Sequence, residues 1–166
     1  SGTATLEAVT SSVIRRGKLI VLSNGYYGDK IAKISRIHNI DTYILEYEWG
    51  EEIKKSDVEK TLRNDPEIKF VAMVHNETST GMLNDVEQIG EIASKYDKVF
   101  IVDAISSIGV EDLSVARDKI HFCIGSPNKC IESVPGLSFV CANREKLEEL
   151  KEMPPKTSYL DLYTYY

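Results

Sequence analysis

Asp103 is the first side chain of this 166-residue sequence whose position suggests chemistry. It ends the apolar run VFIVD, so its carboxylate is expected to be partly removed from water. Desolvation raises the pKa of a carboxyl group unless a cation pairs with it, and a protonated pyridine nitrogen would be such a cation. Aspartates at strand ends also cap the next segment or bind metals. Taken alone, Asp103 favours that simpler interpretation.

Lys129 is the second such side chain, and it lies in the segment Ser126-Pro-Asn-Lys-Cys between two predicted buried strands. A free ammonium group is costly in apolar surroundings. Desolvation lowers the pKa of a lysine and turns its amine into a nucleophile for carbonyl groups. The alternative is an exposed loop lysine, which is the commoner fate of lysines, although Lys129 has no charged neighbours along the chain.

Two further segments carry groups suited to a flat, anionic ligand. Ser1-Gly2-Thr3 heads a predicted helix, and backbone amides with a hydroxyl group at a helix start can bind phosphate. Serine and threonine are also ordinary helix caps, so this signal is weak alone. Tyr27 lies in a glycine-flanked loop, where its ring could either cover a flat heterocycle or pack in the core.

The elements that must position these residues alternate between strands and helices. Short apolar or alternating runs predict strands, and 3.6-residue periodicity or capping patterns predict helices. The predicted strands are Lys18–Ser23, Thr42–Tyr47, Lys69–His75, Val99–Val102, His121–Gly125 and Leu137–Ala142. The predicted helices span 3–16 and Lys30–His38, begin at the capping patterns Ser56–Glu59 and Asn84–Glu87, and follow Asn143. This alternation predicts an α/β fold with a mainly parallel sheet.

Four polar segments follow predicted strands, and this arrangement predicts one ligand site. They are Asn24–Gly28, His75–Gly81, Asp103–Ser107 and Ser126–Lys129. In open α/β sheets, ligands bind beyond the C-terminal ends of the strands. We therefore expect the four segments to meet at that edge of the sheet.

Composition restricts the class of protein. A net charge of −6 disfavours nucleic acid and membrane surfaces as partners, because both attract cations. No apolar run approaches the ~20 residues that span a bilayer, and no export leader is visible. The three cysteines, Cys123, Cys130 and Cys141, lack metal-ligand spacing. We expect reduced, mostly buried thiols in a cytoplasmic protein with no metal site.

Five collinear blocks of the sequence resemble one known family. The blocks are SGTAT (1–5), NGYYG (24–28), VAMVHNETSTGMLN (71–84), IVDAISSIG (101–109) and SPNKCIESVPGLSFV (126–140). Together they resemble the large domain of the class V, fold-type I pyridoxal-phosphate aminotransferases. The resemblance implies a three-layer α/β/α fold with the cofactor domain in residues 1–151. Residues 152–166 would begin the connection to a small C-terminal domain.

The resemblance also implies roles for individual residues. Lys129 would carry pyridoxal 5′-phosphate as a Schiff base, and Asp103 would pair with the pyridinium nitrogen. Tyr27 and Ile105 would pack on opposite faces of the cofactor ring. The remaining implied roles are a hydrogen bond from Thr78 to the ring's phenolic oxygen and a phosphate site made by Gly2, Thr3 and Asn128. Pro127 and the pair Glu132-Ser133 depart from the family's usual residues without touching these roles.

The activity implied by the resemblance is transamination. The blocks HNETSTGMLN and NKC…VPG point to those family members that convert 2-aminoethylphosphonate and pyruvate to phosphonoacetaldehyde and L-alanine in phosphonate catabolism. A class V enzyme of the alanine–glyoxylate or serine–pyruvate type is an alternative. A cofactor-free α/β binding module is an alternative of another class.

Both ends of the sequence suggest a fragment. It opens directly on a helical pattern, and it closes on an aromatic segment after Pro154-Pro155. The family's N-terminal segment, and the small domain whose arginine grips the substrate carboxylate, would then lie outside these residues. We expect the full-length enzyme to be a homodimer, and the isolated chain to have low activity.

Overall fold

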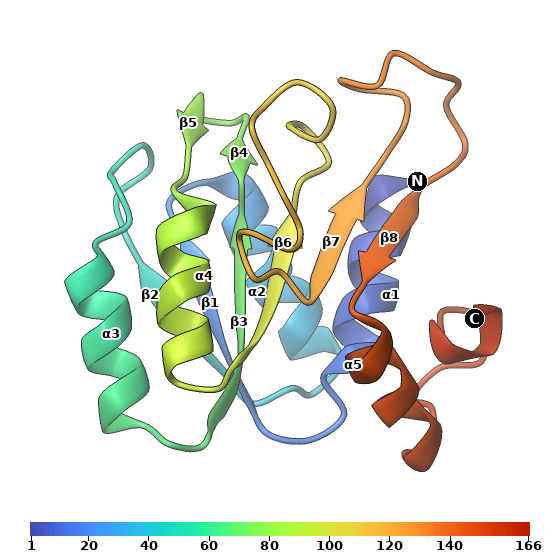
Figure 1. Ribbon diagram of the computed structural model, residues 1–166, viewed down its shortest axis with the longest axis horizontal. Helices are drawn as coiled ribbons and strands as arrows, with labels where there is room; N and C mark the ends of the chain where they lie inside the picture. The colour runs from blue at the N-terminus through green and yellow to red at the C-terminus, as the bar shows by residue number, and fades with distance from the viewer.

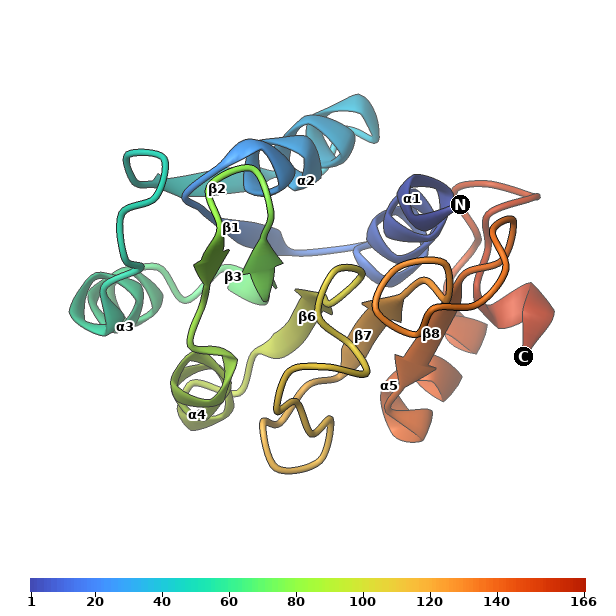
Figure 2. The same cartoon turned by 90° about the horizontal axis from the view of Figure 1, so that it is seen from above.

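The computed structural model describes residues 1–166, which form a central six-stranded sheet with helices on both faces (Figures 1 and 2). The strand order is β2-β1-β3-β6-β7-β8. All neighbouring pairs are parallel except β7 and β8, which are antiparallel. The strands are β1 (Lys18–Ser23), β2 (Thr42–Glu46), β3 (Ile68–Val74), β6 (Val99–Asp103), β7 (Phe122–Gly125) and β8 (Phe139–Ala142). This confirms the predicted mainly parallel α/β architecture.

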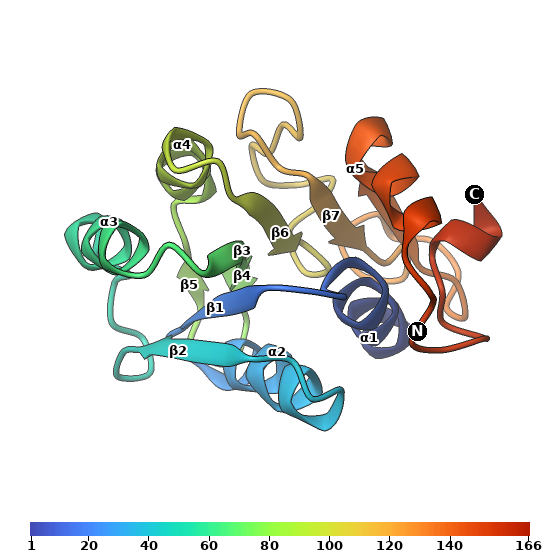
Figure 3. The same cartoon turned by 90° about the horizontal axis from the view of Figure 1, so that it is seen from below.

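Two helices cover each face of the sheet, as Figures 2 and 3 show from opposite sides. On one face lie α1 (Gly2–Val13) and α2 (Tyr26–Ile37), and on the other lie α3 (Lys55–Asn64) and α4 (Val86–Lys95). The short α5 (Arg144–Glu148) and the 3-10 turns η1 (Glu149–Glu152) and η2 (Tyr163–Tyr165) follow β8. A small hairpin of β4 (Asn76–Glu77) and β5 (Met82–Leu83) stands above the end of β3.

Alternation along each strand divides the core into two clusters of 17 buried residues each. In β1, Leu19 and Val21 pack with α1 and α2, whereas Ile20 and Leu22 pack with α3 and α4. Successive side chains of a strand point to opposite faces of the sheet, so a strand covered on both sides must be apolar throughout. This explains why the central strands are continuous apolar runs in the sequence.

Both predicted capping boxes are wrong in detail. Helix α3 begins at Lys55, one residue before the expected cap Ser56, and no side chain caps it. Helix α4 is capped by Asp85 rather than Asn84, through a 2.9 Å bond from the Gln88 amide. A run of several capping residues leaves the helix start ambiguous by one or two positions, and tertiary bonds decide it. The cap at Asn143 is confirmed by its 3.0 Å bond from the Lys146 amide.

Helices α1 and α2 also differ from the predicted bounds. Helix α1 ends at Val13, although its periodicity continues to residue 16. Helix α2 begins at Tyr26, four residues earlier than predicted. The reason is a carboxylate from β4, distant in sequence, that satisfies the amides of the first turn of α2.

The last segment, residues 152–166, lies against α1. The guanidinium group of Arg15 forms a buried ion pair with Asp161, and Ser12 Oγ donates to the Leu160 carbonyl over 2.8 Å. The Lys156 ammonium group donates to the carbonyl of Ile14 over 2.9 Å. The segment is therefore bound to α1 and the residues that follow it through polar contacts.

The cysteines are less uniformly buried than predicted. Cys123 is buried in β7 and Cys130 is partly buried, but Cys141 is exposed. Cys141 lies on β8, the edge strand of the sheet. No helix of the chain is both long and apolar enough to cross a membrane.

Candidate functional site

A cavity of about 330 Å³ lies at the C-terminal edge of the sheet. In Figure 1 this is the upper edge, where the ends of β6 and β7 meet the start of α1. The lining residues are Ser1, Gly2, Thr3, Leu6, Tyr27, Lys30, Asp103, Ile105, Ser126, Asn128, Lys129, Pro135 and Gly136. Of the expected cofactor residues, only Thr78 is outside this lining. Thr78 is exposed in the turn between β4 and β5.

Asp103 is a buried carboxylate in the lining of the cavity. It ends β6 between its register partners Val74 and Ile124, and it is 4% exposed. Burial raises the pKa of its carboxyl group from 3.8 to about 6, against the opposing effects of the Ile105 amide and of Lys129. The Ile105 amide donates to Oδ1 over 3.0 Å. The predicted desolvation of Asp103 is therefore confirmed.

Lys129 reaches the same cavity, but it is exposed rather than buried. Its Nζ donates to Ser106 Oγ over 3.0 Å and lies 5.7 Å from the centroid of the Tyr27 ring. The desolvation argument for Lys129 was wrong because the segment that follows β7 rises above the sheet edge instead of passing between strands (Figure 1). Lys129 is therefore a solvent-accessible amine directed toward a buried carboxylate site.

Tyr27 and Lys30 enter the cavity from α2. The two side chains are three residues apart on the helix, so they share one face. Lys30 Nζ lies 5.9 Å from the Tyr27 ring centroid and donates to Thr3 Oγ1 over 2.8 Å. The sequence reasoning missed Lys30, although its spacing from Tyr27 was a usable signal. Lys30 places a second positive charge, besides that of Lys129, at the start of α1.

The start of α1 is suited to an anion. Ser1 makes no side-chain cap bond, and the first turn contains no acidic residue. A Cβ atom on Gly2 would lie 2.7 Å from Ile105 Cδ1, so the Ile105 side chain packs directly against the Gly2 backbone. Asn128 is held nearby by a 2.5 Å bond from Ser126 Oγ to its Oδ1. Amides at a helix start, with Lys30 beside them, attract negative charge.

Two buried polar residues support the strand ends. The backbone amide of His75 donates to the Asp103 carbonyl over 2.9 Å. The ring atom Nδ1 of His75 lies 3.0 Å from Ser107 Oγ. Burial lowers the pKa of His75, so its ring is neutral near neutral pH. Glu77 is completely buried and bonds the first turn of α2. The sequence reasoning did not single out Glu77.

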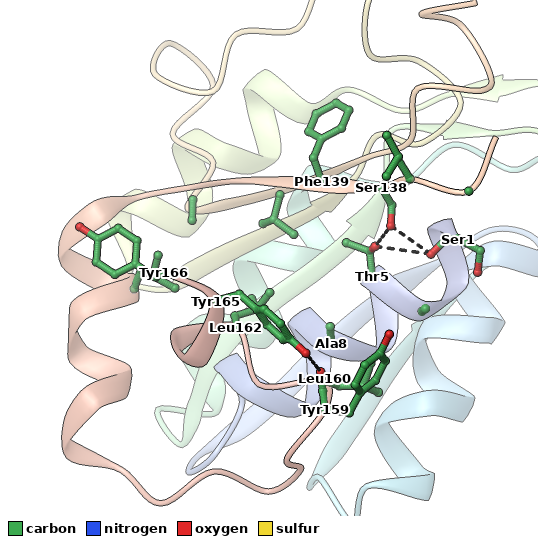
Figure 4. A pocket seen from close by; sticks show the side chains of 16 residues that line it. Ser1, Thr5, Ala8, Ser138, Phe139, Tyr159, Leu160, Leu162, Tyr165 and Tyr166 are labelled. Carbon is green, nitrogen blue, oxygen red and sulfur yellow. Dashed lines mark hydrogen bonds between the residues drawn. The ribbon is translucent and has the colours of Figure 1, made fainter. Parts of the chain in front are cut away.

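A second, larger cavity of about 720 Å³ lies between α1, β8 and residues 159–166 (Figure 4). Most of its lining is apolar, including Ala8, Phe139 and Leu162. Two hydroxyl groups of the lining bond each other, because Thr5 Oγ1 donates to Ser138 Oγ. No carboxylate, lysine, arginine or imidazole side chain lines it.

Comparison with known proteins gives a consistent family. The family model described as aminotransferase class-V matches residues 1–165. A 2-aminoethylphosphonate–pyruvate transaminase of Bacillus mycoides is 43% identical over 164 residues, which are 98% of this chain and 45% of that protein. One of Klebsiella pneumoniae is 43% identical over 167 residues, covering 98% and 44%. The chain thus spans about half the length of the curated relatives it matches.

Solved structures show the same fold. Ureidoglycine–glyoxylate aminotransferase from Bacillus subtilis superposes with a TM-score of 0.91 at 32% identity, covering 98% of this chain and 42% of that one. Pyridoxamine–pyruvate aminotransferase from Mesorhizobium loti gives a TM-score of 0.90 at 26% identity, covering 97% and 42%.

Proposed function

Because this chain belongs to the class-V aminotransferase family, we propose that it is the pyridoxal-phosphate-binding part of a 2-aminoethylphosphonate–pyruvate aminotransferase. The reaction would yield phosphonoacetaldehyde and L-alanine. The observation that carries the proposal is the 43% identity, over 98% of this chain, to relatives named for that activity.

The chemistry of the cavity fits pyridoxal 5′-phosphate. This cofactor has a basic ring nitrogen, an aldehyde, a flat ring and a phosphate, and each has a matching group in the lining. Asp103 is a buried carboxylate without a cation bonded to it, and Lys129 is an accessible primary amine. The cavity volume, about 330 Å³, is in the range typical of small-molecule sites.

Seven of the lining residues, and Thr78 in the turn between β4 and β5, have proposed tasks. Lys129 would bond the cofactor aldehyde, and Asp103 would hold the proton on the ring nitrogen. Tyr27 and Ile105 would enclose the ring. Once bound, the cofactor supplies an electron sink for the substrate's reacting carbon. We propose Gly2, Thr3 and Asn128 for the phosphate, and Thr78 for the phenolic oxygen.

During the reaction, Lys129 would act twice. Its amine would be the nucleophile that holds the cofactor, and as a free amine it would carry a proton to or from the reacting carbon. Lys129 Nζ lies over the Tyr27 ring, 5.7 Å from its centroid, so the amine and the ring face the same part of the cavity. Because Asp103 is buried, water would compete little with its bond to a protonated ring nitrogen.

We propose that residues 1–151 are the cofactor unit and that residues 152–166 lead toward a small domain bearing the substrate-binding arginine. The relatives' greater length supports this division. We further propose a cytoplasmic homodimer for the full-length enzyme, with small-molecule substrates and neither nucleic acid nor membrane as partner. The negative net charge supports the last point.

The proposed activity is tested with the full-length protein by measuring amino-group transfer from different donors. We expect transfer from 2-aminoethylphosphonate to pyruvate to be faster than transfer from alanine or serine to glyoxylate or pyruvate. The variant Lys129→Ala should have no activity. Preference for alanine or serine as donor would instead favour the other class V enzymes. Failure of the chain to bind the cofactor at all would favour a binding module.

A further inference from the structure

Glu77 is a completely buried carboxylate that bonds groups of two separate elements. Its Oε2 accepts from the amides of Tyr27 and Gly28 at 3.0 and 3.1 Å. Its Oε1 accepts from Ser79 Oγ at 2.6 Å and from the Ser79 amide at 3.3 Å. One side chain on β4 thus satisfies four donors.

The start of α2 depends on this carboxylate. The helix cap is Gly25, which has an extended backbone and no side chain to accept the free amides. A negative charge at the positive end of a helix stabilises the first turn. A Cβ atom on Gly25 would lie 2.5 Å from Glu77 Cγ, so a glycine is required for the carboxylate to reach its place. Gly25 therefore serves this contact, whereas Gly28 allows close packing against Ser23.

The same contact fixes Tyr27 relative to the β4–β5 turn. Ser79 Oγ donates to Glu77 and accepts from the Tyr26 amide over 3.0 Å, so the turn and the helix are joined twice. Thr78 lies between Glu77 and Ser79 in that turn. Tyr27, whose ring lines the site cavity, is held at its own amide.

A buried carboxylate is a costly means of stabilising a fold, because its desolvation offsets much of the gain from its bonds. The negative charge of Glu77 also raises the pKa of Asp103, whereas the positive charges of Lys129 and Lys30 lower it. The cost of burying this carboxylate and its effect on Asp103 both indicate that Glu77 positions site residues and contributes to the electrostatics of the site.

We propose that Glu77 is a positioning residue, whose carboxylate fixes the first turn of α2 and thereby the place of Tyr27 over the cofactor. The inference rests on the proposed function. It assigns Glu77 no contact with the cofactor. Its effect passes through the Tyr27 amide and the β4–β5 turn.

The test compares Glu77→Gln with the wild-type chain, because glutamine keeps the volume but loses the charge and turns an N–H₂ group toward the Ser79 amide. Hydrogen exchange of the Tyr27 and Gly28 amides is measured without ligand. Affinity for pyridoxal 5′-phosphate is measured by the visible circular dichroism of the bound form. We expect exchange to be about tenfold faster and affinity about tenfold weaker, equal to about 1.4 kcal/mol. Glu77→Ala should increase amide exchange and weaken cofactor affinity more than Glu77→Gln does.

The matched control is Asp85→Asn, with Asp85→Ala beside Glu77→Ala. Asp85 caps α4 through the Gln88 amide, so it is also a carboxylate at a helix start, but α4 contributes no residue to the cavity. We expect the control variants to change neither Tyr27 exchange nor cofactor affinity. The inference is overturned if Glu77→Gln keeps wild-type affinity, or if its effects equal those of Asp85→Asn. If the wild-type chain binds no cofactor, the proposed function fails, and amide exchange alone decides whether Glu77 holds the turn.

Discussion

The burial of Asp103 makes a prediction about stability as well as chemistry. The carboxyl group is 4% exposed, and its pKa is raised by burial from 3.8 to about 6. The folded state therefore disfavours the ionised form of the Asp103 carboxyl group. The substitution Asp103→Asn removes the charge and keeps the shape of the side chain, so it isolates the free energy associated with ionisation in the folded state.

The magnitude follows from the difference between the two pKa values. A difference of about 2.2 units, at about 1.36 kcal/mol per unit, corresponds to about 3 kcal/mol. Between these pKa values the folded chain binds more protons than the unfolded chain, so the free energy of unfolding falls as pH rises. This contribution is complete below the unfolded pKa, and it is lost as pH rises through about 6.

Urea unfolding of the ligand-free chain at several pH values measures the effect. We expect Asp103→Asn to be more stable than wild type by up to about 3 kcal/mol near neutral pH, with the difference vanishing at about pH 4. Asp85→Asn, at an exposed helix cap, should show little difference at any pH because the two residue types cap equally well. A wild type as stable as Asp103→Asn at neutral pH, or a difference independent of pH, would refute the reasoning.

Three further substitutions test other contacts. Lys30→Met should weaken pyridoxal-phosphate binding about tenfold, and added inorganic phosphate should compete less in the variant, since one cation of the anion site is lost; isothermal titration measures both. Asp161→Ala should lower the free energy of unfolding by about 3 kcal/mol in urea, because it leaves Arg15 buried without its ion pair. Gly25→Ala should lower the thermal midpoint, because its Cβ atom meets Glu77; an unchanged midpoint would contradict the close approach.

Much of the fold was predictable from the sequence because the central strands are covered on both faces. Their residues are apolar without interruption, and each run ends where a polar segment begins. Asp103 was predictable for the same reason, since the end of a buried strand fixes both its place and its burial. Helix starts were less predictable. In α2 the amides are satisfied by Glu77, some fifty residues away, which no local pattern reveals.

The environment of Lys129 shows a second limit. Its neighbours in sequence are apolar or neutral, and this suggested burial. The structure places it in a segment that leaves the sheet edge, where exposure depends on tertiary packing rather than on composition. The bond from Lys30 to Thr3 joins α2 to α1, and the bond from Lys129 to Ser106 joins the segments after β7 and β6, so both partners depend on tertiary packing.

The central claim is that Lys129 is the amine that bonds pyridoxal 5′-phosphate in this cavity. It is tested by incubating the chain with the cofactor, reducing with borohydride, and locating the added mass by peptide mass spectrometry. We expect the adduct on Lys129 alone, with none in Lys129→Ala and an undiminished adduct in Lys33→Ala, whose lysine lies outside the cavity lining. An adduct on Lys30, or an unselective distribution over surface lysines, would contradict the account.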